Sequence, residues 1–407
     1  MSWFSYFLFV PFLLSAASHQ FHEAPYQAGY DIDFSPYAGG EDLLFAHRAV
    51  ERIEGFFVAK TSLYRSTTAS ARFWRFSELY LGWLPLNYLA IVVQHEVFGH
   101  GYRIRDIGST KAQVQGYDFE TPPPYGWGGA VTHYKISSSF TSTDETCVAM
   151  AGVESTAILA QLTKLKWLQA GRIDPRQTVL YLLGQHDLNL YIGSLEVSND
   201  EELDGHDIHA YIQSLNTTYT DHSLSKGRLQ SLSWINLGDP FSFYSIYAWF
   251  RYIASGKETR IPMIPIYGMG YLPGVRLGLT PFGPELFIEN YLSKHKEPIY
   301  FYLKGGSHSD NRYGGMGVYV PQMWNQNGWS LGFRFDAWRQ PKLLLKSGPY
   351  SYAEQHAMRF GGAGSFIIAY QKRSGFEAEV GYKSQGFLPG YALRASPTLR
   401  LFYSLRF

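Results

Sequence analysis

The sequence predicts an α+β protein, in which an N-terminal α-helical region is followed by an antiparallel β-barrel of about 8–10 strands. At about Phe241 the spacing of apolar residues changes from the helical period of 3.6 to the strand period of 2. The composition points the same way, with 17% aromatic residues and 40 glycines. Abundant Tyr, Phe and Gly with moderate hydropathy are typical of membrane β-barrels, whose strands alternate apolar and polar residues. We expect an N-terminal segment 1–18, a helical region 19–237 and a strand region 238–407.

Residues 1–18 have the features of a secretory signal peptide. Trp3–Leu14 is apolar, and Ala16, Ala17 and Ser18 supply the small residues expected at a cleavage site. No basic residue precedes the apolar core, so an uncleaved anchor is the alternative, with the protein in the periplasm or the inner membrane. Cys147 is the single cysteine, which excludes an intramolecular disulfide. We expect it to be a small core residue.

The first helices are expected at Glu41–Ser62 and from Pro85 to about Gly101. Arg72–Glu78 is expected to be a short amphipathic connector between them. The apolar run Leu79–Val93 is about 15 residues long, whereas a membrane-spanning helix needs about 20. The run therefore predicts a buried core helix.

His95, Glu96 and His100 lie at the end of this run, in the pattern H-E-x-x-x-H. In zinc hydrolases the pattern H-E-x-x-H places two imidazoles one helical turn apart, with the Glu between them as general base. On an ideal helix the longer spacing would leave the imidazoles about 140° apart. A single π-type turn would bring them together again, and Gly99 would permit that distortion at low cost.

The hexapeptide His95–His100 resembles H-E-x-x-G-H, the zinc motif of the dipeptidyl-peptidase III family, and has its glycine at the same place. The resemblance covers this hexapeptide, the following Gly101 and one later helix, and it does not extend to the rest of the chain. The resemblance implies Zn²⁺ as cofactor, His95 and His100 as ligands, and Glu96 as the catalytic base. The alternative is a buried helix whose histidines are only hydrogen-bonded.

The next segment is expected to contain a loop from Asp106 to Thr132, a strand at Val131–Ser139 and a helix at Asp144–Ala170. Glu154 lies on an apolar face of that helix, where an unpaired carboxylate would be costly. In zinc peptidases of the gluzincin type the third ligand is a Glu on a second helix. In the dipeptidyl-peptidase III family this ligand is the second Glu of a motif that resembles E-E-C-x-A-E. This chain matches the motif at Glu154 and Ala157 and has Val153 and Ile158 where the family has acids. The resemblance therefore implies Glu154 as the third metal ligand. A capping or ion-paired acid is the alternative.

Further helices are expected at Gln177–Ser194, Asp200–Leu215 and Asp221–Leu237. The second of these contains His206 and His209, which lie three residues apart and could share a helix face. They are the alternative metal ligands, or groups that stabilise an oxyanion. A solvated helix face is the other interpretation.

The C-terminal region shows the alternation of strands. Trp329, Leu331, Phe333 and Phe335 alternate with polar residues or glycine, and we count seven to nine such segments between residues 271 and 407. The chain ends in Thr398–Phe407, where every second residue back from Phe407 is apolar or aromatic. This resembles the closing strand of bacterial outer-membrane β-barrels, and it implies contact with outer-membrane lipid.

These observations predict a zinc-dependent metallohydrolase anchored in the bacterial outer membrane, with a peptide or protein as substrate. One alternative is an outer-membrane pore or adhesin with a structural metal or none, which closed four-ligand coordination would favour. An intramembrane protease is disfavoured by the short apolar run. A formal net charge of +1 gives no electrostatic argument for a nucleic-acid partner. The substrate and the oligomeric state do not follow from the sequence.

Overall fold

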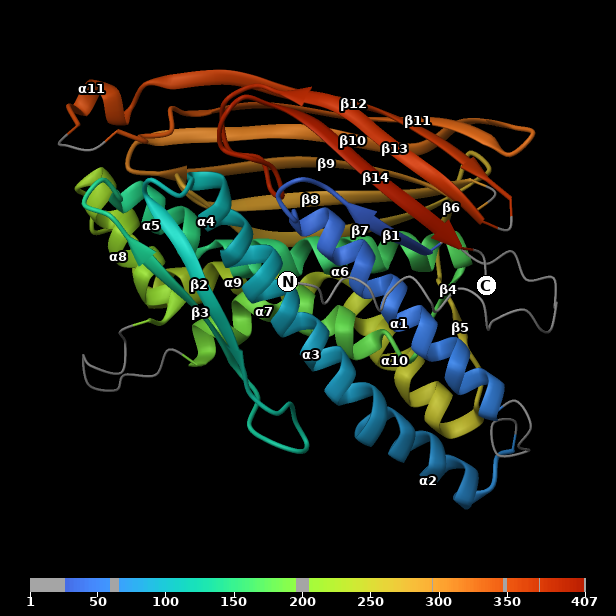
Figure 1. Cartoon of the computed structure of the whole chain (residues 1–407). Helices are drawn as coiled ribbons and strands as arrows, with labels where there is room; N and C mark the ends of the chain where they lie inside the picture. Colours follow the sequence, from blue (N-terminus) through green and yellow to red (C-terminus); the bar gives the residue numbers. More distant parts are fainter. Residues whose placement is uncertain are drawn as a thin grey trace.

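The computed structural model describes residues 26–58, 66–194, 205–294, 296–346, 350–372 and 374–405. The expected signal peptide and Phe407 lie outside these residues. The fold is α+β, with one large curved sheet on one side and a layer of helices beneath it (Figure 1). Helix α6 (Ala151–Ala170) runs beneath the sheet and packs against β7 and β9.

The sheet is antiparallel and open, with ten strands in the order β1-β14-β13-β12-β11-β10-β9-β8-β7-β6. Its strands are β1 (Tyr26–Tyr30), β6 (Ile264–Ile266), β7 (Met269–Thr280), β8 (Gly283–Lys294), β9 (Glu297–His308), β10 (Asn311–Gln326), β11 (Trp329–Pro341), β12 (Met358–Gln371), β13 (Ser374–Lys383) and β14 (Ser396–Leu405). The expectation of a closed barrel is therefore corrected. One edge strand, β1, pairs with β14 and packs on its other side against helix α1 (Pro36–Val58), and helices occupy the place where further strands would close the sheet.

The two faces of the sheet have opposite polarity. Exposed apolar side chains cover the outer face, namely Ile288, Leu303, Met316, Leu331, Phe335, Phe366, Ile368, Val380, Leu399 and Leu401. The inner face carries buried ion pairs between Lys304 and Glu285 (3.0 Å) and between Arg400 and Glu379 (3.0 Å). A sheet of a soluble protein normally buries its apolar face and exposes its polar one, so this sheet is reversed.

One row of aromatic residues crosses four adjacent strands on the outer face. The register pairs Trp329 with Tyr370, Tyr370 with Phe376, and Phe376 with Tyr403. The rows that follow are largely aliphatic, and the row at Phe335 lies about 20 Å along the strand from the row at Trp329. This ordering has the form of an aromatic girdle beside an apolar band, which is about 25 Å tall in membrane barrels.

The helical layer contains one long continuous helical run. It consists of α2 (Ala69–Ser77), the π-helical segment η3 (Glu78–Trp83), α3 (Leu84–His95), the π-helical segment η4 (Glu96–His100) and α4 (Gly101–Ile107). By length and composition alone, two helical runs of the described residues could cross a membrane. These are Ala69–Ile107 (mean hydropathy 1.3) and Ser142–Ala170 (mean hydropathy 1.2). The most apolar window is 94% buried in the second run but only 28% buried in the first, so the expected buried core helix at Leu79–Val93 is corrected.

The remaining elements follow in chain order. They are β2 (Ala112–Phe119), β3 (Ala130–Ile136), α5 (Ser142–Ala149), β4 (Arg172–Ile173), α7 (Thr178–Ser194), α8 (Asp207–Tyr219), α9 (Lys226–Ser233), the 3-10 segment η6 (Trp234–Gly238), α10 (Pro240–Ser255), β5 (Thr259–Arg260) and α11 (Tyr352–Gln355). Strand β2 lies where a loop was expected, and α10 lies where strands were expected. Helix α10 begins with Pro240 at its first turn and ends at Gly256, whose φ of 67° suits a helix C-terminus.

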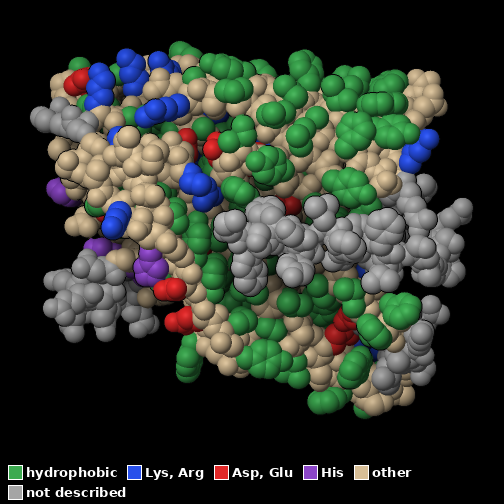
Figure 2. Space-filling model, viewed as in Figure 1, with side chains coloured by type: hydrophobic (Ala, Val, Ile, Leu, Met, Phe, Trp, Pro, Cys, Tyr) green, Lys and Arg blue, Asp and Glu red, His purple; other side chains and the backbone are tan. Residues whose placement is uncertain are grey.

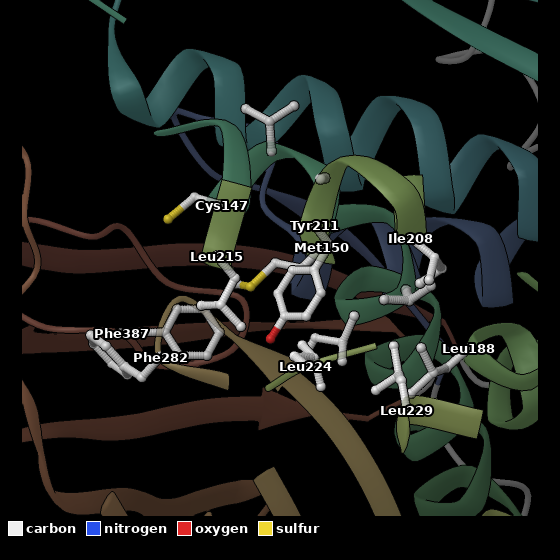
Figure 3. Close-up of a cluster of buried hydrophobic side chains, with 14 of the residues drawn as sticks. Cys147, Met150, Leu188, Ile208, Tyr211, Leu215, Leu224, Leu229, Phe282 and Phe387 are labelled. Atoms are coloured by element: carbon white, nitrogen blue, oxygen red, sulfur yellow. The ribbon is translucent and has the colours of Figure 1, made fainter. Parts of the chain in front are cut away.

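A buried apolar cluster fixes the position of α8. In it, Ile208 and Leu215 from α8 lie with Leu188 from α7, Met150 and Phe282 (Figure 3). Cys147 belongs to the same cluster and is fully buried, as expected. Because Ile208 is held in this cluster, the neighbouring Asp207 is held at the first residue of α8, facing the long helical run.

Candidate metal centre

The two histidines of the H-E-x-x-x-H pattern lie side by side. The segment η4 from Glu96 to His100 is one π-helical turn, as the five-residue spacing predicted. The rings of His95 and His100 have centroids 4.9 Å apart. Both side chains are buried. The extra residue of the π turn therefore places both imidazoles on the same side of the helical run.

Each imidazole is oriented by an acceptor behind it. His95 Nδ1 lies 2.9 Å from Asp187 Oδ2, and His100 Nδ1 lies 2.8 Å from the Val148 carbonyl oxygen. Because both partners can only accept, each Nδ1 carries the proton and donates it. The hydroxyl of Thr156 donates to the same Asp187 oxygen at 2.7 Å. This leaves both Nε2 atoms pointing toward the centre, and such outer hydrogen bonds are usual for metal-bound histidines.

Two glycines allow the close approach of the helices that carry this arrangement. A Cβ on Gly152 of α6 would lie 2.1 Å from His95 Nε2, and a Cβ on Gly99 would lie 2.7 Å from the Ala151 carbonyl oxygen. A side chain at Gly152 would therefore collide with the ring of His95. The role expected for Gly99 was to ease the π turn, and the structure adds that Gly99 also allows η4 to approach α6.

Asp207 completes the group. Its Oδ2 lies 3.0 Å from His95 Nε2 and 3.1 Å from His100 Nε2, and the three ligand atoms all lie within 4.8 Å of one another. In a tetrahedral zinc site, ligand atoms about 2.0–2.2 Å from the ion stand about 3–3.5 Å apart. Two imidazole nitrogens and one carboxylate oxygen at this separation fit a divalent ion, with one position left open.

The charge of the site also favours a cation. Within the described residues, Asp187 and Asp207 form ion pairs only with the two imidazoles. Burial alone would raise the pKa of Asp207, but His100 and His95 outweigh it and hold that pKa well below its usual range. Asp207 is therefore an anion throughout the range in which the protein is expected to work.

Glu96 lies beside this group without joining it. Its Oε2 accepts a hydrogen bond from the Thr132 hydroxyl of β3 at 2.6 Å. Tyr191 stacks on the ring of His95, with centroids 4.7 Å apart. Burial, followed by the charges of Asp207, Asp187 and Glu96, raises the pKa of Tyr191 well above its usual value, so its phenol stays neutral. Glu96 directly follows His95 and begins the π turn that ends at His100, so it lies next to the metal-binding group.

The structure does not bring Glu154 to the histidines. Arg103 donates to both of its oxygens, at 2.9 and 3.0 Å, and the Gly390 N–H donates to Oε1 at 2.6 Å. Both oxygens of the Glu154 carboxylate therefore accept hydrogen bonds from the protein. The expected third ligand is therefore corrected to Asp207, and Glu154 is the ion-paired acid that the sequence left as the alternative.

His206 and His209 lie near the group but outside it. His206 Nδ1 accepts from the Ile208 N–H at 3.2 Å as the N-cap of α8, and its Nε2 lies 3.2 Å from Ser194 Oγ. His209 is half-buried on α8. The group formed by the described residues contains neither histidine, so it offers three protein ligands rather than a closed shell of four.

Asp187, Asp207 and Thr132 belong to the site but were not predicted from the sequence. Asp207 lies within the stretch Gly205–His209 that attracted attention for its histidines, and Asp187 follows His186 on α7. The sequence could have placed Asp207 at the start of a helix, because the helix dipole favours an acid at that position. For Thr132 the sequence holds no comparable signal.

No protein-family model, curated protein or solved structure matches this chain.

Proposed function

We propose that this protein is a metal-dependent hydrolase, with Zn²⁺ held by His95, His100 and Asp207 and with a peptide bond as its target. The observation that carries the proposal is the convergence of three ligand atoms beside the buried carboxylate of Glu96. A zinc ion with three protein ligands and one open position supplies Lewis acidity and an activated water. Two imidazoles and a carboxylate also suit Fe(II), but the adjacent general base favours hydrolysis.

The residues of the chain have separate roles in this proposal. Glu96 takes a proton from the attacking water and passes it to the leaving nitrogen. The Thr132 hydroxyl fixes the orientation of Glu96 through their hydrogen bond. Asp187 fixes the tautomer of His95. Tyr191 covers one face of the His95 ring and limits access of water from that side.

The proposal includes attachment to the bacterial outer membrane through the sheet. What supports it is the reversed polarity of the sheet, with apolar rows outside and ion pairs within, together with the aromatic row at one end. A pore is less well supported, because α6 packs against the inner face of the sheet and is buried over most of its length.

The decisive test compares Glu96→Gln with the wild type in detergent solution. We expect the variant to keep its metal and to lose turnover of a fluorogenic peptide mixture by about 10²-fold or more. Glu145→Gln, at an exposed acid of α5, is the matched control and should keep full activity. Full activity in Glu96→Gln would contradict the mechanism. Elemental analysis of the wild type identifies the ion, and iron in place of zinc would contradict the assignment as a zinc hydrolase.

A further inference from the structure

The long helical run has the same reversed polarity as the sheet. Arg75, Asn87 and Gln94 are buried and fully shielded from solvent. Most exposed residues of the same run are apolar or aromatic, namely Phe73, Trp74, Phe76, Tyr80, Leu81, Leu86 and Leu89. The exposed polar residues, Ser70 and Arg72, lie in its first turn. A helix on the surface of a soluble protein places its polar residues outward. This run therefore presents a mainly apolar side to its surroundings, while its buried side combines the buried polar residues with Leu79, Trp83 and Ile91.

Helix α10 extends this apolar surface. It packs against α2, and the rings of Phe76 and Trp249 meet edge to face with centroids 6.2 Å apart. Its buried side includes Ser242 and Ser245. Its exposed side consists of Phe243, Ile246, Tyr247 and Phe250. Two neighbouring helices thus share one outward apolar face.

Helix side chains also satisfy the backbone at both edges of the open sheet. At β1, Asp42 Oδ1 of α1 accepts from the Gly29 N–H at 2.7 Å. At the other side of the sheet, β6 pairs only with residues 269–271 of β7, so the rest of β7 forms the edge. There Asn236 Oδ1 of η6 accepts from the Leu277 N–H at 2.6 Å, and the Gln185 amide of α7 donates to the Val275 carbonyl at 3.4 Å. An open sheet edge is not stable in lipid unless its backbone groups find partners. Here the helices provide them.

We propose that the helices complete the wall that the sheet begins, and that the outer faces of α2, η3, α3 and α10 contact the acyl chains of the bilayer. The inference rests on the proposed attachment to the membrane and extends it from the sheet to the helical half. Lipid is the occupant because the apolar surface continues over both halves, whereas a protein partner would cover one patch. Most of the basic and histidine side chains visible in Figure 2 lie toward one end of the molecule, as expected for a part that projects from a bilayer.

The proposal also places the metal centre. His95 and His100 follow directly on the apolar helical face, and Thr132 in the hairpin of β2 and β3 contacts Glu96. The hairpin begins beside α4 and extends away from the sheet (Figure 1). The centre therefore lies near the boundary between lipid and water. The substrate class that this position favours is a polypeptide held at the membrane surface.

The test uses single cysteines labelled with an environment-sensitive fluorophore in the full chain. Leu86→Cys and Leu89→Cys report on the helical face, Leu401→Cys reports on the sheet, and Lys135→Cys on β3 reports on water. Cys147 is fully buried, and wild type treated with the same fluorophore checks that Cys147 does not react. Each protein is reconstituted in vesicles of brominated or unbrominated phosphatidylcholine, and iodide is added outside and inside.

We expect the labels at residues 86 and 89 to lose emission in brominated lipid as strongly as the label at residue 401, and to resist iodide. The label at residue 135 should show the opposite behaviour. Iodide quenching at residues 86 and 89, with lipid quenching at residue 401, would overturn the inference while the attachment through the sheet stands. Protection from both quenchers would place a second copy on the helices and would also overturn it. Iodide quenching at residue 401 as well would overturn the proposed attachment itself. If Leu86→Cys does not fold, Phe250→Cys on α10 gives the same comparison.

Discussion

Two buried charged clusters lie one helical turn apart on the same helical run, and they are built differently. In the first, His95 and His100 face Asp207, with Asp187 behind them. In the second, Arg103 is bound by Glu154 on one side and by Asp106 on the other, at 2.9 Å each. The second cluster is closed in charge, because a permanent cation meets two carboxylates. The first contains anions and imidazoles and is balanced only when protons or a metal ion supply the positive charge.

The comparison shows why a buried acid is not by itself evidence for a metal ligand. Glu154 satisfies the argument that a carboxylate on an apolar face needs a partner, but its partner is Arg103. Asp207 lies at a helix terminus and meets only imidazoles within the described residues. The identity of the neighbouring cation therefore separates a structural acid from a ligand.

The largest expected difference between the clusters is in metal content. Asp207→Ala removes one ligand of three and should reduce the bound metal from about one equivalent to none. Glu154→Gln should leave about one equivalent in place, because Glu154 contacts no ligand. Elemental analysis of protein purified without chelators measures both. Metal lost from Glu154→Gln and kept by Asp207→Ala would reverse the assignment.

The second difference is in stability. Glu154→Gln leaves the buried Arg103 guanidinium short of its main counter-charge, which should lower the free energy of unfolding by about 3–5 kcal/mol. Denaturant unfolding in detergent measures the loss. Asp118→Asn, which removes an exposed ion pair with His133 on the hairpin, is the control and should change stability little. An equally small change for Glu154→Gln would show that the second cluster is not a closed ion pair.

A third experiment tests the outer support of the metal cluster. Asp187→Asn keeps the size of the side chain but weakens the hydrogen bond that fixes the His95 tautomer. We expect metal affinity to fall by about 10–100-fold, measured by competition with a chromogenic chelator. Asp118→Asn, at an exposed acid outside the cluster, controls for the loss of one negative charge. Unchanged affinity in Asp187→Asn would show that the Val148 carbonyl and packing orient the histidines without Asp187.

The last difference between the clusters is in how metal binding depends on pH. Asp207 has its pKa held well below its usual range, so it stays an anion between pH 5 and pH 8 and the pH dependence comes from the imidazoles. Metal binding must displace protons from the imidazoles, so affinity should fall as pH falls, by up to about 100-fold per unit once both are protonated. Titration of metal binding between pH 5 and pH 8 measures the slope. An affinity independent of pH would exclude the imidazoles as ligands.

Much of this site was predictable, but its third ligand was not. The five-residue spacing between His95 and His100 brings both imidazoles to one side of a helix only with a π turn, and the structure contains one. Asp207 comes into reach because Ile208 and Leu215 dock α8 into a core shared with residues as distant as Phe282. Such long-range packing leaves no local pattern. The sequence therefore predicted the part of the site that one helix carries and missed the part that tertiary packing supplies.

The fold, too, was predicted from the sequence only in part. Alternating residues on β11 to β14 predicted the strands and their apolar face. They could not predict that the sheet stays open, because Asp42, Gln185 and Asn236 are ordinary polar residues until their helices lie along the sheet edges. The helix α10 was missed because its aromatic residues surround the axis and blur the helical period. The apolar run before His95 was judged too short to span a membrane because α2 was expected to be a separate connector and was not recognised as its continuation.

The pairing of β1 with β14 has a consequence for how the protein is made. Tyr26 lies opposite Leu405, so the two ends of the described chain are neighbours in the finished sheet. Contacts between residues so distant in sequence form slowly. Until the last strand is synthesised, β1 has no strand to pair with, and afterwards β14 has a free edge until β1 arrives. Until β1 and β14 meet, each strand has an unpaired edge, and an unpaired edge is a site where a strand of another chain can add.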